Sequence, residues 1–246
     1  MSQLPGYLWA ITFAGVVGIL VSTGIVLYGG AVRAGLDRRR SGGMTAVAAV
    51  LFGGWLIASS LIGVAGGYRA RIGHGIPWMP VAVVGFLVLL LMLARIPSVH
   101  RALRSDGTGS RLLIPHSFRV AEGVVFLISM ALGFLPALFA IPAGLGDIAI
   151  GIAAPLVAQR LNSGTGERAP RRFSLLGMAD LIVALGLGGL VGFQLVPFIP
   201  AAPAISSLPL VLIPTVGVPL LLALHVTSLS ALRSARSSAR TPALAG

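Results

Sequence analysis

The chain has 246 residues, of which 56% are hydrophobic and only 10% are charged. A typical soluble domain carries about 25% charged residues, so this chain has too little charge to cover a surface that faces water, and lipid is the expected surrounding. The net charge of +12 does not indicate a nucleic-acid partner, because the arginines lie between apolar segments rather than along one helix face.

Seven apolar segments are predicted to form membrane-spanning helices. A helix needs about 20 apolar residues to cross a bilayer, and it satisfies its own backbone hydrogen bonds in lipid. We expect an all-α, polytopic transmembrane helix bundle of about seven spans, forming one domain over residues 1–232, with a flexible cytoplasmic tail at 233–246. The predicted spans are residues 7–28, 44–64, 78–94, 118–135, 137–158, 173–196 and 208–231.

The first span lacks a basic segment ahead of it and a clear cleavage site after it, so we expect an uncleaved span rather than a signal peptide. The polar stretch RSDGTGS, residues 104–110, is expected to be a flexible connection before the fourth span. In the last span, Pro214 and Pro219 predict a kink.

The arginines predict how the helices are oriented. Sixteen of the eighteen lie in or beside the loops after the first, third and fifth spans or in the C-terminal segment, and only Arg69 and Arg71 lie on the other side. Basic residues concentrate on the cytoplasmic side of membrane proteins. We therefore expect the N-terminus outside and the C-terminus in the cytoplasm. Abundant Ala, Gly and Arg without any Lys suggests a GC-rich bacterial genome, and hence a multi-pass protein of the cell inner membrane.

The fifth span is the least regular, because LPALFAIPAGLGD, residues 135–147, contains two prolines and two glycines before its aspartate. Such breaks can form discontinuous helices that line a cavity, although tight outer turns are the simpler interpretation. Asp147 lies near mid-membrane if the helix begins at Ala137. If the helix begins near Gly144, Asp147 caps it at the outer surface, and there it could bind a cation or an amine. Arg69, Arg71, His74 and Gln194 could complete such an outer site. We favour the cap.

Asp180 interrupts an apolar run in the sixth span. It shares one helix stripe with Ala184, Gly188 and Gly192. Small residues at this spacing allow another helix to approach closely. We therefore expect Asp180 to face a closely packed helix rather than lipid.

Three further ionisable residues are expected near Asp180, in the cytoplasmic half of the bundle. Arg119 and Glu122 lie one turn apart in the fourth span and could pair directly. His225 lies about 9 Å, and Asp180 about 10 Å, inside the cytoplasmic end of its span. We predict a cluster of Arg119, Glu122, Asp180 and His225, since ionisable residues in spans usually face the interior and pair.

The cluster has two interpretations: a static ion-pair lock between helices, or the path of a proton or solute. In the second, the protein is a small permease or an ion- or proton-coupled transporter. Asp180 would be the coupling carboxylate with His225 as its partner. Arg119 and Glu122 would form a cytoplasmic gate, and Asp147 would be an outer contact.

Two other functions stay open. The short loops and small-residue stripes also suit a non-catalytic helper subunit that binds a membrane-protein partner or a second copy of the chain. A membrane enzyme acting on a lipid or hydrophobic cofactor could use His116, Glu122 and Asp180 as acid–base groups, but no catalytic motif supports it, and we do not expect an enzyme.

The sequence identifies no metal and leaves the cofactor unknown. The absence of lysine excludes covalently bound retinal, and the absence of cysteine excludes disulfides and thiolate metal sites. A haem held by two histidines fits poorly, because only His225 lies clearly within a span.

Overall fold

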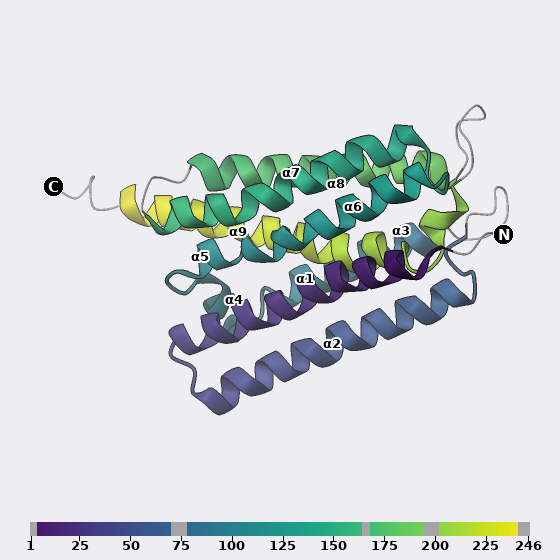
Figure 1. The fold of residues 1–246 in the computed structure, drawn as a ribbon. Helices are drawn as coiled ribbons and strands as arrows, with labels where there is room; N and C mark the ends of the chain where they lie inside the picture. The colour runs from purple at the N-terminus through teal and green to yellow at the C-terminus, as the bar shows by residue number, and fades with distance from the viewer. Residues whose placement is uncertain (1–3, 70–77, 164–167, 194–201, 241–246) are drawn as a thin grey trace.

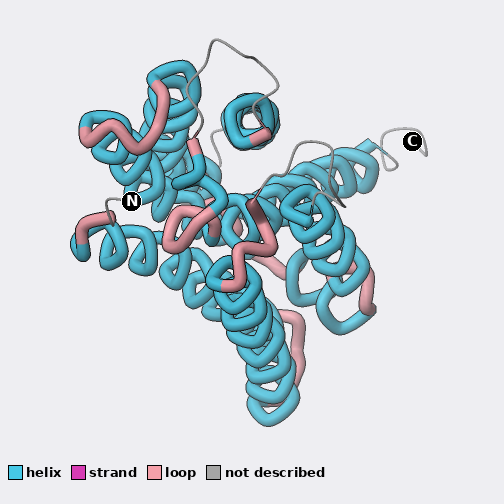
Figure 2. Tube along the Cα trace, turned by 90° about the vertical axis from the view of Figure 1, so that its right-hand side faces the viewer, coloured by secondary structure: helices cyan, strands magenta, loops and turns pink. Residues whose placement is uncertain are grey.

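The computed structural model describes residues 4–69, 78–163, 168–193 and 202–240, and none of these residues is in a strand. The long helices lie side by side along one axis (Figure 1). Figure 2, a view from the end where α1 begins, shows only helices and their connecting loops in this part of the chain. The longer helices are α1 (Gly6–Arg33), α2 (Arg38–Val64), α3 (Trp78–Leu93), α6 (Arg119–Ala131), α7 (Ala137–Asn162), α8 (Arg168–Gly192) and α9 (Val218–Arg240).

These helices have the length and apolarity of membrane spans. Within the described residues, six helical segments are long and apolar enough to cross a bilayer, or seven if the bent pair of α3 and α4 (Pro97–Arg104) counts as one. The expected all-helical fold with apolar, span-like helices is therefore confirmed.

The buried core lies around α9. In the segment Ile213–Leu232, 67% of the residues in its apolar 18-residue stretch are buried inside the protein. The corresponding share is 17% for α2 and 17% for α8. On α2, Val47 and Val50 are among the most exposed large side chains. Exposed apolar faces of this extent are typical of helices that contact lipid.

The span-like segment that contains α6 is built from several pieces. A short helix α5 (Thr108–Arg111) and a 3₁₀ helix η1 (Ile114–Phe118) precede α6, and the combined segment Thr108–Ala131 has the properties of one span. Before it, α4 is bent by 85° from the direction of α3.

The expectation of a flexible connection over residues 104–110 was wrong, because these residues pack against α1. The Ser105 hydroxyl donates to the Gly30 carbonyl at 2.9 Å, and Arg33 Nη2 donates to the Thr108 hydroxyl at 3.0 Å. The polar residues that suggested flexibility instead attach this segment to the end of α1.

A glycine turn sends α7 back along α6. Gly133 has a φ of +78°, which favours glycine. Its N–H donates to the Met130 carbonyl, and the Phe134 N–H donates to the Ser129 carbonyl at 2.8 Å. This Schellman pattern ends α6, and α7 begins directly after Pro136.

The last span-like segment begins irregularly. A 3₁₀ helix η2 (Pro203–Ser206) and a π-helical turn η3 (Ile213–Gly217) precede α9, and Pro214 lies in that turn. The helix α9 then continues to Arg240, into the range where we expected a flexible tail, while residues 241–246 lie outside the described residues.

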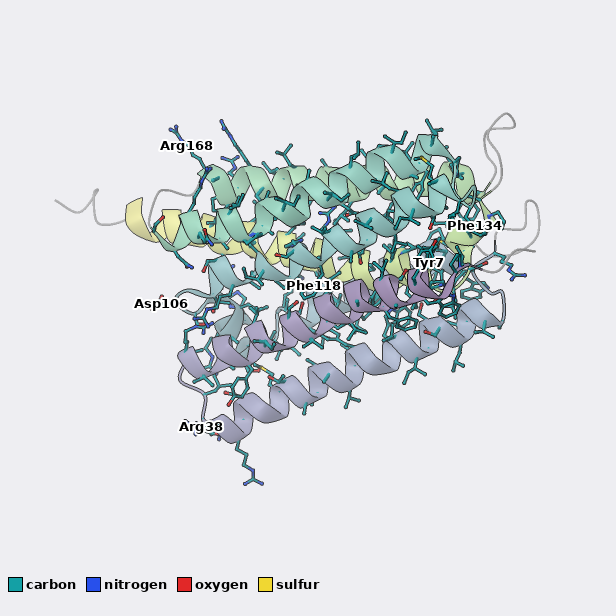
Figure 3. All side chains as sticks on the ribbon, viewed as in Figure 1. Tyr7, Arg38, Asp106, Phe118, Phe134 and Arg168 are labelled. Atoms are coloured by element: carbon teal, nitrogen blue, oxygen red, sulfur yellow. The ribbon has the colours of Figure 1, made fainter. Side chains whose placement is uncertain are left out.

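The arginines gather at one end of the bundle. Figure 3 labels Arg38, Asp106 and Arg168 at this arginine-rich end and Tyr7 and Phe134 at the other. The start of α1 and the end of α9 lie at opposite ends (Figure 1).

Candidate functional site

Arg119, the first residue of α6, is fully buried and joins three helices. Its Nε donates to Oδ1 of Asp147 on α7 at 2.7 Å, and its Nη2 donates to Oδ2 of Asp180 on α8. Nη1 points at the carbonyl of Gly177 on α8 at 3.5 Å. The planar guanidinium group, with several donors in a fixed arrangement, suits this multiple pairing.

Glycines allow these helices to approach one another. A Cβ added to Gly144 would lie 3.0 Å from the carbonyl oxygen of Gly123 on α6, and one added to Gly151 would lie 2.8 Å from the backbone nitrogen of Val120. A Cβ at Gly146 would collide with the carboxylate of Asp180. The sequence GLGD therefore places Asp147 against Arg119 and leaves room for Asp180 on the same side of α7.

Asp147 is not a helix cap, so the capping interpretation was wrong. The helix α7 begins at Ala137 and continues through Pro142, which puts Asp147 about 15 Å along it. The residue is only 3% exposed. It therefore lies in the interior of the bundle with Arg119, not at the outer surface. Three residues that we considered for an outer site, Arg71, His74 and Gln194, lie outside the described residues.

Glu122 does not pair with Arg119 as its spacing allowed. It is fully buried, and neither carboxylate oxygen has a hydrogen-bond partner among the described residues. Glycines of two other elements surround it: a Cβ on Gly217 would lie 2.7 Å from Oε1, and one on Gly15 would lie 3.4 Å from Cγ. Arg119 instead extends toward α7 and α8, so Glu122 stands alone between α1 and the start of α9.

A pair of histidines adjoins the arginine on the side toward the arginine-rich end. His116 on η1 and His225 on α9 are fully buried and stack with ring centroids 4.0 Å apart. Their ring nitrogens have no hydrogen-bond partner in the described part of the chain. Phe173 meets His116 edge-on at 5.5 Å, and a Cβ on Gly177 would collide with His225. We had named His116 as a possible acid–base group and had not placed it in the cluster with His225.

A cavity of about 200 Å³ reaches the cluster from the other direction. It lies between α3 and α8 and is lined by apolar side chains and glycines, with Asp147 as its one ionisable lining residue in the described part of the chain. The stripe expected to be closely packed therefore contacts protein only in part. Asp180 contacts Arg119, but Ala184 and Gly188 line this cavity.

The site thus combines five ionisable residues from four span-like helices with a sixth, His116. Asp147 and Asp180 pair with one guanidinium group, and the carboxyl group of Glu122 lies one turn along α6 from Arg119. Among the described residues, no three His, Asp or Glu side chains are arranged to hold a metal ion. The arrangement can bind and release protons or accept a cation, because its negative groups outnumber its positive one.

Comparison of the sequence with known proteins identifies a family. The model of a family described as domain of unknown function (DUF8737) matches residues 76–233, which is more than half of the chain, so the chain belongs to this family. The matched range contains every residue of the cluster and begins after α2. No curated protein and no solved structure matches the chain.

Proposed function

We propose that this member of the DUF8737 family is a small membrane transporter that couples the movement of a solute to protons. The observation that carries this proposal is Glu122, a fully buried carboxyl group without a hydrogen-bond partner among the described residues, one turn from a salt-bridged arginine. A group of this kind is suited to carrying a proton.

Charge counting supports a moving proton rather than a static lock. A lock needs only matched charges, and Arg119 with one aspartate would supply them. Here two aspartates share the arginine and a third carboxyl group lies beside them. An ionised carboxylate without a partner is costly in a low-dielectric interior, so Glu122 holds a proton at rest. A change in the partners of Arg119 would alter this balance and release the proton.

The surroundings of the cluster support a route across the bundle. The cavity approaches Asp147 on one side, and the stacked His116 and His225 lie on the other. Histidines are common proton carriers. In this proposal Glu122 is the coupling carboxyl group, Arg119 exchanges one of its aspartate partners for Glu122, and the histidines pass protons toward the arginine-rich end.

We further propose seven spans, with the arginine-rich end in the cytoplasm of a bacterial cell and the N-terminus outside. The positive-inside rule supports this orientation, and an odd number of crossings agrees with helix ends that lie at opposite ends of the bundle (Figure 1). The cavity then opens in the outer half of the membrane.

The test is proton flux into liposomes that contain the purified protein and a pH-sensitive dye, driven by a potassium diffusion potential. Glu122→Gln keeps the shape of the side chain but cannot ionise, and we expect it to lower the flux at least about tenfold. The matched control is Ser129→Ala, which changes another buried polar side chain of the same helix stripe. We expect its flux to stay within about twofold of the parent protein.

Folded Glu122→Gln protein with undiminished proton flux would contradict the proposal. Asp180→Asn tests the alternative of a static ion-pair lock between helices. Unchanged proton flux with lowered thermal stability would assign Asp180 a structural role only.

A helper subunit is the second candidate, and the exposed surface of α2 favours it. A Cβ added to Gly42, Gly43, Gly53 or Gly54 would meet no atom within 4 Å, so another helix could approach this face closely. Co-purification of a stoichiometric membrane partner, together with no proton flux, would favour this alternative.

A further inference from the structure

The cavity between α3 and α8 has the composition of a binding site for one class of small molecule. Its walls come from α3, α6, α7, α8 and the region that begins α9, and they are apolar apart from Asp147. Phe126 and Phe139, whose rings meet edge-to-face at 5.1 Å, form part of its inner wall. An apolar pocket with one polar anchor fixes the orientation of a ligand that has a polar end and an apolar body.

We propose that this cavity binds a small lipophilic amine, with its ammonium group against Asp147 and its apolar part between α3 and α8. This inference rests on the transport function proposed above and names the class of its substrate.

The cavity is accessible from the bilayer. It is not enclosed, and α3 and α8 make little direct contact with each other. Their outer faces are apolar: Val84 on α3 is 58% exposed and Ile182 on α8 is 61% exposed. A lipophilic molecule dissolved in the membrane can therefore enter between these helices without crossing a polar barrier.

The volume of about 200 Å³ limits the size of the ligand. Typical ligand pockets measure about 300–1,000 Å³, so this one suits a molecule with a single ring or a short alkyl chain. A phospholipid or a large polycyclic compound does not fit.

The charges around Asp147 select a cation. Asp147 and Asp180 are the two negative groups of the cluster while Glu122 holds its proton, and Arg119 is the one positive group. An ammonium group adds the missing positive charge, whereas a carboxylate ligand would add a third negative one. An amine that occupies Asp147 also weakens its pairing with Arg119 and frees the guanidinium group for Glu122. Binding of the cation thereby favours release of the Glu122 proton, and this links the two events.

The test measures binding of phenethylammonium to the protein in lipid nanodiscs, with empty nanodiscs subtracted and no ion gradient. We expect 2-phenylethanol, a neutral molecule of nearly the same size, to bind at least about tenfold more weakly, because it lacks the charge that Asp147 selects. Asp147→Asn should reduce the preference for the amine.

Because Asp147→Asn also removes a partner of Arg119, a second variant avoids the charged cluster. Ala184→Leu fills the cavity from α8, and we expect it to weaken phenethylammonium binding at least about tenfold. The matched control, Ala179→Leu, makes the same change on the exposed face of the same helix, and its binding should stay within about twofold.

Equal binding of the amine and the alcohol, or unchanged binding to Ala184→Leu, would overturn the inference. If Glu122-dependent proton flux persists without amine binding, this inference fails alone and the transport proposal stands. Charge-selective amine binding without any proton flux would support the binding site and contradict transport.

Discussion

Arg119 carries a positive charge into the interior of the bundle, where it is fully buried between Asp147 and Asp180. Such a charge is expensive to desolvate, and its partners repay the cost only while all of them are present. The three side chains therefore behave as a unit. Removing the arginine alone leaves two carboxylates close together without a counter-charge.

We expect Arg119→Leu to lower the free energy of unfolding by about 3–5 kcal/mol, because it strands Asp147 and Asp180. The triple replacement of all three residues by leucine should lose less stability than this single change, since it removes the unpaired charges as well. Unfolding of the detergent-solubilised proteins in increasing sodium dodecyl sulfate measures both. A triple variant that is less stable than Arg119→Leu would contradict this account of the site.

The sequence indicated the ionisable residues of the site better than it indicated their partners. Asp180, Arg119, Glu122 and His225 were recognised because charge in an apolar span is costly and rare. Asp147 was misplaced because its depth depends on whether Pro142 breaks the helix. In the structure it does not, and proline is tolerated in membrane helices whose freed carbonyls find other partners.

Helices α6 and α7 approach each other through glycine rather than through interlocking large side chains. A Cβ on Gly123 would lie 2.8 Å from Cγ1 of Ile148 and 3.1 Å from Cβ of Asp147. This contact fixes the distance between the helices that carry Arg119 and Asp147. A small increase in side-chain volume there should therefore disturb both the packing and the salt bridge.

We expect Gly123→Ala to destabilise the protein by about 1–3 kcal/mol, because it overfills a closely packed interface. The control is Gly54→Ala on α2, where an added Cβ meets nothing within 4 Å. That change should be neutral or stabilise by up to about 1 kcal/mol, since alanine favours helix more than glycine does. Thermal unfolding in detergent compares the stability of the two variants. Equal losses of stability would show that the close contact at Gly123 does not cause the destabilisation.

The start of α9 depends on a side chain from α2. Pro219 has no N–H to donate to the carbonyl of Thr215, one helical turn earlier. The indole Nε1 of Trp55 donates to that carbonyl at 2.8 Å instead. Next to it, the Thr215 hydroxyl lies 2.7 Å from the hydroxyl of Ser59. These contacts satisfy the irregular turn and hold it beside Glu122.

Trp55→Phe should cost about 1–3 kcal/mol, because it leaves the buried Thr215 carbonyl without its donor while keeping a ring against Phe86, whose centroid lies 5.0 Å from that of Trp55. Trp78→Phe, at a side chain that is 52% exposed, is the matched control. Chemical unfolding monitored by circular dichroism suits both variants. A loss confined to the control would refute the role given to Trp55.

Hydropathy predicted where helices occur because an apolar segment in lipid must satisfy its own backbone hydrogen bonds, and a helix does so. It did not reveal the short helices before α6, since α4 and α5 are polar and their order comes from contacts with α1 at Gly30 and Arg33. It also could not reveal which helices are neighbours. Apolar segments of similar composition fit many arrangements, and here the glycine contacts and the Arg119 salt bridges select one.

The chain as a whole should insert with its arginine-rich end in the cytoplasm. Because the protein contains no cysteine, single-cysteine variants report their location without background. We expect Ser163→Cys, at the arginine-rich end, to react with a membrane-impermeant maleimide in inside-out vesicles at least about tenfold faster than in intact spheroplasts. Gly6→Cys, at the start of α1, should show the opposite preference. Labelling of both positions from the same side would contradict an odd number of crossings between Gly6 and Ser163.

Helix α4 bends by 85° from the direction of α3 directly after α3 ends, so α3 cannot be extended at this end to match a thicker bilayer. A difference between the length of a helix and the thickness of the hydrocarbon core is then absorbed by tilting of the helix or by deformation of the bilayer, at a modest cost for each ångström of mismatch. Since α3 is a wall of the cavity, the length of the lipid acyl chains becomes a control on the protein, because a change in bilayer thickness should move this wall.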